Sequence, residues 1–338
     1  MKATTLPVVH ILMATCQGEA YLAQQLESIE KQSYANWRLH VSDDGSTDKT
    51  LDILQAFKVR WEQVGAQNPL GHLDTQVKGG SVHLYQGPNQ GPTENFMHLV
   101  RLLGEDPDVG VEDLFAFADQ DDVWLPEKLE RAVAWHLKER SQRVTAKAHP
   151  MLYAAKSYLV DEALNPKGLS KTPKGPLAFT GALVENVLSG NTMVVNGALI
   201  QVLKRMQVSQ AVWHDWSAYL VATACAGVLF YDEAPCVLYR QHEKNVIGVK
   251  TGWVEQGLRV RAVLRGRYKS WTQMNLNGLK EIDAFVTEDV RQIVQRFESL
   301  RLEKTIWQRV LKMRQLSLKR QNVFMQVLLY MGLALGVV

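Results

Sequence analysis

Residues 115–124 read Phe-Ala-Phe-Ala-Asp-Gln-Asp-Asp-Val-Trp, a short apolar run that leads directly into three carboxylates. Such a run is typical of a buried strand. Acidic side chains packed this closely repel one another, so we expect a cation to compensate them, and a divalent metal that carries a phosphate is the natural candidate. A solvated acidic loop after a strand is the alternative. The rest of the chain has to decide between the two.

The order of strand, polar loop and helix recurs on both sides of this stretch. The patterns predict strands at 8–14, 37–42, 82–85, 114–118, 151–155, 228–231 and 236–239, helices at 21–29, 49–57, 95–103, 126–137 and 198–206, and a long surface loop at 61–81. This alternation is typical of a doubly wound α/β sheet, in which ligands gather at the carboxyl ends of the strands.

Charge divides the chain into two parts. Residues 1–250 contain 23 Lys and Arg against 28 Asp and Glu, whereas the remainder contains 15 against 7. We therefore expect one domain over 1–250 and a basic, amphipathic helical region over 251–338 with an apolar end. The three cysteines lie far apart without metal-ligand spacing, which favours a reducing compartment over a disulfide framework.

Five motifs in order resemble family 2 glycosyltransferases of the GT-A fold, and the last two resemble the bacterial rhamnosyltransferase-like branch. They lie at Ala14–Leu22, Asp43–Asp48, Asp119–Trp124, His214–Trp216 and Tyr239–Gly248. The likeness covers about 8–248, and the region from 250 onward adds nothing to it. It implies a Rossmann-like, mostly parallel mixed sheet with helices on both faces. It also implies transfer of rhamnose or another hexose.

The resemblance implies a site for a nucleoside-diphosphate sugar linked to dTDP, UDP or GDP. Carboxylates at strand ends accept hydrogen bonds from a base or a ribose, and hard oxygen ligands suit Mg²⁺ or Mn²⁺ shared with phosphates. The metal ligands would be Asp121 and His242. The donor-binding residues would be Thr15, Glu19, Asp43, Asp44, Asp119 and Arg240.

Asp215 is the predicted general base, because inverting transfer needs one carboxylate to accept the proton of the acceptor hydroxyl. A helix cap is the alternative role for Asp215. The acceptor side would comprise Gly190, Asn191, His214 and Trp216. Related sequences often carry Cys at the position of Asn191.

The acceptor is expected to be a glycan or a polyprenyl-linked glycan in cell-surface polysaccharide synthesis. The N-terminus shows no secretory signal, and 323–338 is too short to span a bilayer comfortably. We therefore expect a cytoplasmic protein, peripheral on the inner face of the cell membrane, whose basic tail contacts lipid while its apolar end either inserts or packs on the protein. The acidic site argues against nucleic acid. A non-catalytic sugar-nucleotide-binding protein and a nucleotidyltransferase are the competing interpretations.

Overall fold

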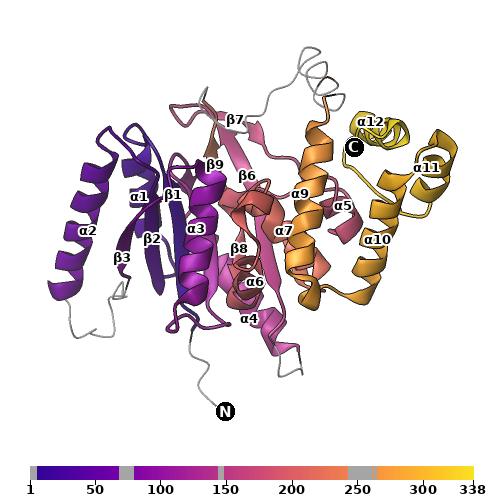
Figure 1. Cartoon of the computed structure of the whole chain (residues 1–338). Helices are drawn as coiled ribbons and strands as arrows, with labels where there is room; N and C mark the ends of the chain where they lie inside the picture. Colours follow the sequence, from indigo (N-terminus) through magenta and orange to yellow (C-terminus); the bar gives the residue numbers. More distant parts are fainter. Residues whose placement is uncertain (1–5, 68–79, 144–147, 243–260, 262–264) are drawn as a thin grey trace.

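The computed structural model describes residues 6–67, 80–143, 148–242, 261 and 265–338 (Figure 1). Their strands form one mixed sheet in the order β3-β2-β1-β4-β8-β6-β9-β5, with β7 paired to β6. The strands are β1 (Val9–Thr15), β2 (Trp37–Asp43), β3 (Val82–Gln86), β4 (Leu114–Asp119), β5 (Val123–Trp124), β6 (Met151–Val160), β7 (Pro166–Leu169), β8 (Val194–Asn196) and β9 (Val228–Arg240). The first four strands in this order run parallel, and β8 is antiparallel to β4.

Helices cover both faces of the sheet, as Figure 1 shows. One face packs on α1 (Leu22–Glu30), α2 (Thr50–Gln67) and α4 (Lys128–Ser141), and the other on α3 (Pro92–Glu105), α6 (Gly197–Leu203) and α7 (His214–Ala224). Strand alternation separates the two cores, since Ala116 and Ala118 of β4 face the first group while Phe115 and Phe117 face the second. The predicted α/β class and the two-sided helical cover are confirmed.

The short connecting elements are a helix, α5 (Phe179–Ala182), and three 3₁₀ turns, η1 (Gly190–Thr192), η2 (Val208–Gln210) and η3 (Asp283–Phe285). The predicted loop at 61–81 is wrong at its start, because α2 continues to Gln67. Trp61 explains the extension: it is buried, stacks on Trp37 with centroids 4.7 Å apart, and donates from Nε1 to the Gly80 carbonyl at 2.7 Å. Residues 68–79 lie outside the described part.

The C-terminal region comprises α9 (Arg267–Glu281), α10 (Glu288–Leu302), α11 (Ile306–Met313) and α12 (Val323–Leu335). Leu276, Phe297 and Leu333 from this region belong to the same buried cluster as Leu12 and Phe115 of the sheet. The proposed boundary at 250 itself lies in 243–260, outside the described residues. The division into a domain over 1–250 and a helical region over 251–338 therefore stays a proposal.

Replacing Phe297 by Ala is expected to lower the free energy of unfolding of the whole chain by about 3–5 kcal/mol, since the ring is fully buried in the shared core. Urea titration followed by circular dichroism measures this. The matched control is Trp307→Ala, whose ring is 79% exposed and whose loss should change stability by no more than about 0.5 kcal/mol. Two separate transitions, with only the smaller one shifted by Phe297→Ala, would contradict a shared core.

Candidate active site

The parallel strands bring their polar ends to one edge of the sheet. In the register, Ala14 of β1 lies beside Asp119 of β4, and Thr15 lies beside Asp43 of β2. The three loops that follow β1, β2 and β4 therefore meet at the carboxyl edge, where ligands of open α/β sheets bind. Thr15 and Asp43 are buried at this edge, and Asp119 is partly exposed.

The loop after β2 is held by its own two carboxylates. Asp43 accepts hydrogen bonds from the Thr15 hydroxyl at 2.8 Å and from the Ser46 backbone N–H at 2.8 Å. Asp44 accepts from the backbone N–H groups of Asn89 at 2.6 Å and Gly91 at 2.7 Å. Each carboxylate keeps lone pairs beyond these bonds, so a role for either in nucleotide binding stays a prediction.

Gln120 ties the acidic loop to the loop after β1. Its Nε2 donates to the Cys16 carbonyl at 2.9 Å, and its Oε1 accepts from the Cys16 backbone N–H at 2.9 Å. A Cβ at Gly18 would lie 2.4 Å from this Oε1, so only glycine leaves room for the pair. Glu19, an expected donor ligand, is exposed and accepts from the Lys49 backbone N–H at 3.1 Å.

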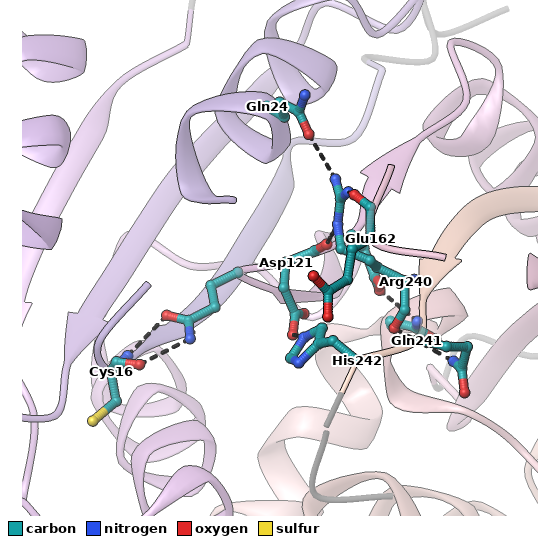
Figure 2. Close-up of polar contacts among 10 residues, drawn as sticks. Cys16, Gln24, Asp121, Glu162, Arg240, Gln241 and His242 are labelled. Carbon is teal, nitrogen blue, oxygen red and sulfur yellow. Dashed lines mark hydrogen bonds and ion pairs between the residues drawn. The ribbon is translucent and has the colours of Figure 1, made fainter. Parts of the chain in front are cut away.

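Asp121 and His242 form the polar centre of the acidic loop. His242 Nε2 lies 2.8 Å from Asp121 Oδ2, and the imidazole stacks on Tyr21 with centroids 5.2 Å apart (Figure 2). The two-residue strand β5 makes this meeting possible. It pairs antiparallel with β9, and so brings the end of β9 back to the acidic loop. Of the last motif, Asn245 and Gly248 lie outside the described residues.

Arg240 is buried, and its guanidinium crosses between three segments. Its Nε donates to the Asp121 carbonyl at 2.8 Å, and its two terminal nitrogens donate to the Glu162 carbonyl and, at 2.6 Å, to Gln24 Oε1 (Figure 2). The same group lies over the ring of Tyr21, 4.4 Å from its centroid. These bonds fix the backbone of Asp121 to α1 and to the turn after β6.

Burial and mutual repulsion change the ionisation of this cluster. Burial, with the charges of Asp121 and Asp215, raises the pKa of Asp119 to about 7. Burial also raises the pKa of Asp122 well above its usual range, although this side chain accepts from Asn191 Nδ2 at 2.5 Å and from the Arg240 backbone N–H at 3.1 Å. These raised pKa values mean that the ionised carboxylates are disfavoured at the strand end, which a bound proton or cation would relieve.

Lys128 is a second buried basic residue whose charge acts on Asp119 and Asp122. Its Nζ donates to the Asn191 carbonyl at 2.9 Å and lies 3.2 Å from the centroid of the Trp124 ring. Burial lowers the pKa of Lys128 to about 7. Asn191, expected on the acceptor side, is thus buried beneath the acidic loop and braces it from both its side chain and its backbone.

Asp215 sits in the first turn of α7 and is 8% exposed. Its Oδ2 accepts from the Gly190 backbone N–H at 3.1 Å, and its Oδ1 accepts from the Trp216 backbone N–H at 2.7 Å. Burial raises the pKa of Asp215 to about 6. A carboxylate with this pKa releases and accepts a proton near neutrality, as a general base must. The charge of Asp215 also acts on Asp119, which places both in one acidic site.

The two ring side chains next to Asp215 in the chain, His214 and Trp216, are packed against the protein core. His214 stacks on Phe96 with centroids 3.9 Å apart, and burial lowers the pKa of His214 to about 3, so its imidazole is neutral. A Cβ at Gly190 would lie 2.6 Å from His214 Nε2, which explains glycine there. Trp216 is buried and donates from Nε1 to the Ala182 carbonyl at 2.6 Å. The ring of Trp216 therefore faces the core beneath the site.

The donor set fits a divalent cation held jointly with a phosphate. Within the described residues, no group of three or more His, Cys, Asp or Glu side chains could hold a metal by itself. Asp121 and His242 nevertheless present an oxygen and a nitrogen ligand 2.8 Å apart, beside Asp119, whose pKa is raised by burial and by the charges of Asp121 and Asp215. Such a pair supplies part of a coordination shell, and the donor's phosphates would supply the rest.

Sequence reasoning missed the residues that hold the site together, chiefly Gln24, Gln120, Lys128 and Glu162. Gln120 stands inside the acidic motif, where its position between two aspartates is the one available signal. Lys128 follows no pattern that separates it from a solvent-exposed lysine in the first turn of a helix. Its burial depends on the approach of η1 and β9, which the local sequence does not encode.

Comparison with known proteins agrees with this geometry. Residues 10–149 match the family model described as glycosyl transferase family 2. The chain is 25% identical over 280 residues to "dTDP-rhamnosyl transferase RfbG" of Shigella flexneri, covering 82% of this chain and 88% of that protein. It is 28% identical over 131 residues to "UDP-Glc:alpha-D-GlcNAc-diphosphoundecaprenol beta-1,3-glucosyltransferase WfgD" of Escherichia coli, covering 39% and 42% respectively.

A solved structure of S. aureus TarS superimposes with a TM-score of 0.49 at 15% identity, over 85% of this chain and 86% of that one. The matched residues of the family model contain the loops after β1, β2 and β4, which form the carboxyl edge described above. Residues 10–149 therefore form a glycosyltransferase family 2 domain, and the chain is a glycosyltransferase with RfbG as a relative over 82% of its length.

Proposed function

We propose that this glycosyltransferase transfers rhamnose or another hexose, with inversion, from a nucleoside diphosphate to a glycan or lipid-linked acceptor in cell-surface polysaccharide synthesis. The observation that carries the proposal is the buried carboxylate of Asp215, which lies in the same acidic site as Asp119 and has its pKa raised to about 6. A single such base suffices for inversion, because no covalent intermediate needs a second carboxylate.

Donor binding is assigned to the edge formed by the loops after β1, β2 and β4. Thr15, Asp43 and Asp44 would receive the nucleoside, with Glu19 at the rim and Asp119 beside the ribose. RfbG, which aligns with most of this chain, is named a dTDP-rhamnosyl transferase. This name supports a dTDP-linked rhamnose as the first donor to test. UDP- and GDP-linked sugars are the alternatives.

Mg²⁺ or Mn²⁺ would be held by Asp121 and His242 and, when bound, would neutralise charge on the departing nucleoside diphosphate. Arg240 keeps its predicted role in donor binding in this proposal. It also has a positioning role, since its guanidinium holds the Asp121 carbonyl and Gln24. Asp215 accepts the proton of the acceptor hydroxyl as that oxygen attacks the anomeric carbon.

The acceptor would approach over Gly190, with His214 as a neutral wall beside Asp215. Asn191 and Trp216 support this side from below, through Asp122 and the Ala182 carbonyl. The printed name of WfgD, a diphosphoundecaprenol glucosyltransferase, supports a polyprenyl-linked acceptor. Membership of a glycosyltransferase family argues against the nucleotidyltransferase and non-catalytic alternatives.

A donor panel tests the proposal directly. In the presence of Mn²⁺, a cognate sugar nucleotide at about 100 times its Kd is expected to stabilise the native state by about 2.7 kcal/mol, and so to raise the melting temperature. The same donor should then give a transferred product whose anomeric configuration, read by NMR, is opposite to that of the donor. Retention of configuration would exclude inversion. Failure of every dTDP-, UDP- and GDP-sugar to raise the melting temperature would contradict the donor class.

A further inference from the structure

Exposed apolar side chains gather at the C-terminal end of the molecule. Among the described residues, eighteen large hydrophobic side chains are exposed, and ten of them lie between Leu302 and Leu335. Scattered surface hydrophobics are ordinary, but a cluster on two successive helices marks an interaction surface.

The helix α12 carries one continuous stripe of these side chains. Met325, Leu329 and Leu333 are buried against the protein, whereas the opposite side exposes Val323 at 80%, Val327 at 51%, Met331 at 55% and Leu335 at 54%. The helix contains no charged residue. Its outer face is therefore as apolar as its packed face. Exposing such a face to water is unfavourable.

The helix α11 adds a second apolar surface next to it. Arg309 of α11 donates to the Ala334 carbonyl of α12 at 3.1 Å, so the two helices are in contact at the outer end of the molecule (Figure 1). No residue of α11 is buried, and Ile306, Trp307 and Leu311 are 54%, 79% and 60% exposed. We call the exposed side chains of α11 and α12 the apolar surface.

Positive charge surrounds this apolar surface. Residues 301–338 contain seven Lys and Arg and a single acidic residue, Glu303. Lys304, Arg314 and Lys319 are exposed. A groove of about 380 Å³ runs beside α12, where Lys319 and Arg320 meet Val323 and Tyr330. The groove is thus lined by both cationic and apolar side chains.

We propose that the apolar surface docks on an anionic lipid bilayer, with α11 and α12 lying in the interface. Apolar side chains would enter the boundary between headgroups and acyl chains while Lys and Arg meet the lipid phosphates. A second copy of the chain is a less suitable occupant, because two surfaces with this excess of positive charge repel one another.

The geometry excludes spanning for these helices. The thirteen residues of α12 give a length of about 20 Å, short of the hydrocarbon thickness of about 30 Å. Within the described ranges, no helix combines the length and the apolar character needed to cross a bilayer. Helices that lie parallel to the membrane plane bury the apolar side chains and keep the Lys and Arg side chains at the headgroups.

The apolar surface is attached to the acceptor side of the site. Arg320 and the Gln321 backbone bind the carboxylate of Glu185, at 3.3 and 2.7 Å, and the segment that contains Glu185 leads directly to Gly190. Docking there would bring Gly190 and Asp215 toward an acceptor held in the membrane. This deeper statement rests on the proposed lipid-linked acceptor, whereas lipid binding itself does not.

Co-sedimentation of the full chain with vesicles tests the inference without any donor. We expect binding to vesicles of phosphatidylcholine with about one third phosphatidylglycerol, and at least about tenfold weaker binding to pure phosphatidylcholine, with a decrease as salt rises from about 0.1 to 0.5 M. The double variant Val327→Glu/Met331→Glu should lose at least about tenfold in affinity, because the apolar contact is replaced by like charge to the lipid.

Matched variants separate lipid contact from general damage. Leu169→Glu, at a side chain 50% exposed on β7, should bind as the parent does, and Lys304→Glu/Lys319→Glu should weaken binding to the anionic vesicles alone. Turnover of a short soluble acceptor should be unchanged in all of these variants, which reports on folding. Asp215→Asn should still sediment, so loss of catalysis and loss of docking remain distinguishable.

Absence of co-sedimentation with anionic vesicles would overturn the proposal, and so would equal binding by Val327→Glu/Met331→Glu. Sedimentation velocity without lipid supplies the remaining test. A dimer that dissociates in Met331→Glu would assign the apolar surface to a second copy, whereas a monomer in both proteins supports the lipid assignment.

Discussion

Replacing Asp215 by Asn is expected to lower kcat by about 10²–10⁴-fold while leaving donor affinity within about twofold. Asn keeps one oxygen that accepts from the Gly190 N–H, now 3.1 Å from Oδ2, but its amide nitrogen cannot accept from the Trp216 N–H, which now donates to Oδ1 at 2.7 Å. It lacks the basic lone pair that takes the acceptor's proton. Single-turnover transfer and donor titration by calorimetry measure the two quantities separately.

The competing role for Asp215 is that of an acid in the first turn of a helix. Asp52 stands at the matching place in α2 and is exposed, so Asp52→Asn is the control for that role. A purely electrostatic helix-end effect would change stability by about 0.3–1 kcal/mol in both variants and leave kcat intact in both. Equal turnover by the parent and by Asp215→Asn would remove Asp215 from the mechanism.

The pH dependence follows from the same residue. Asp215 works as the carboxylate, and its pKa is raised to about 6 by burial, so kcat should fall about tenfold per pH unit as the pH drops below about 6. The residual activity of Asp215→Asn should lack this acid limb.

Stability moves in the opposite direction. The folded-state pKa lies above the ordinary aspartate value of 3.8, so the folded state holds the proton more tightly than the unfolded state does. Ionised Asp215 therefore opposes folding above about pH 6, and this cost is relieved as the pH falls. Neutral Asn at this position removes this cost at pH 7, which offsets the loss of the hydrogen bond that Asp215 accepts from the Trp216 N–H.

The parts of the fold that the sequence predicts are those with strong local patterns. The apolar runs of β1, β2 and β4 end at acidic or hydroxyl residues, and parallel pairing then gathers these ends without further information. Such runs can be recognised in the sequence because a strand that is buried on both faces contains few polar residues. The predicted helical pattern at 95–103 can be recognised for the same reason on one face, although the helix in the structure already begins at Pro92.

Two elements that complete the site carry no such pattern. The strand β5 has only Val123 and Trp124, too few for a period to appear, and its partner β9 is more than a hundred residues away. The long strand β9 reads as two, because Pro235 interrupts it. In the structure the chain passes Pro235 with an irregularity in its pairing to β6, which is how a sheet accommodates proline.

Partners of buried polar groups are the least predictable feature. Arg240 is predicted to bind the donor, and the sequence does not indicate that its guanidinium also donates to the Asp121 carbonyl and to Gln24 on α1. Asn191 looks like part of an acceptor surface, yet its amide supports Asp122. Residue type gives the number of donors, whereas tertiary contacts decide where those donors point.

Removing divalent metal with excess EDTA is expected to lower transfer by at least about 10²-fold, with recovery on adding Mn²⁺ or Mg²⁺. The physical reason is the acidic loop itself: burial and the charges of Asp121 and Asp215 already raise the pKa of Asp119 to about 7. A dianionic diphosphate arriving beside these carboxylates adds further repulsion, which a divalent cation offsets. Undiminished transfer in excess EDTA would exclude a metal requirement.

Asp121→Ala should raise the Mn²⁺ concentration for half-maximal activity by at least about tenfold, because one of the two proposed protein ligands is lost. Asp106→Ala, at an exposed carboxylate just after α3, is the control and should leave this concentration unchanged. Calorimetric titration of Mn²⁺ in the presence of the nucleoside diphosphate gives the same comparison without turnover. An unchanged metal affinity in Asp121→Ala would move the ligand to another carboxylate of the loop.

His242 then decides whether the Asp121–His242 pair binds metal or merely orients a carboxylate. Gln at 242 supplies a hydrogen-bond donor to Asp121 Oδ2 but a poor metal ligand. If His242 ligates the metal, His242→Gln should weaken Mn²⁺ binding about as much as His242→Ala does. If it only holds Asp121 in place, His242→Gln should restore most of what His242→Ala loses. The first result supports a shared metal site, and the second leaves Asp121 as the one protein ligand of the pair.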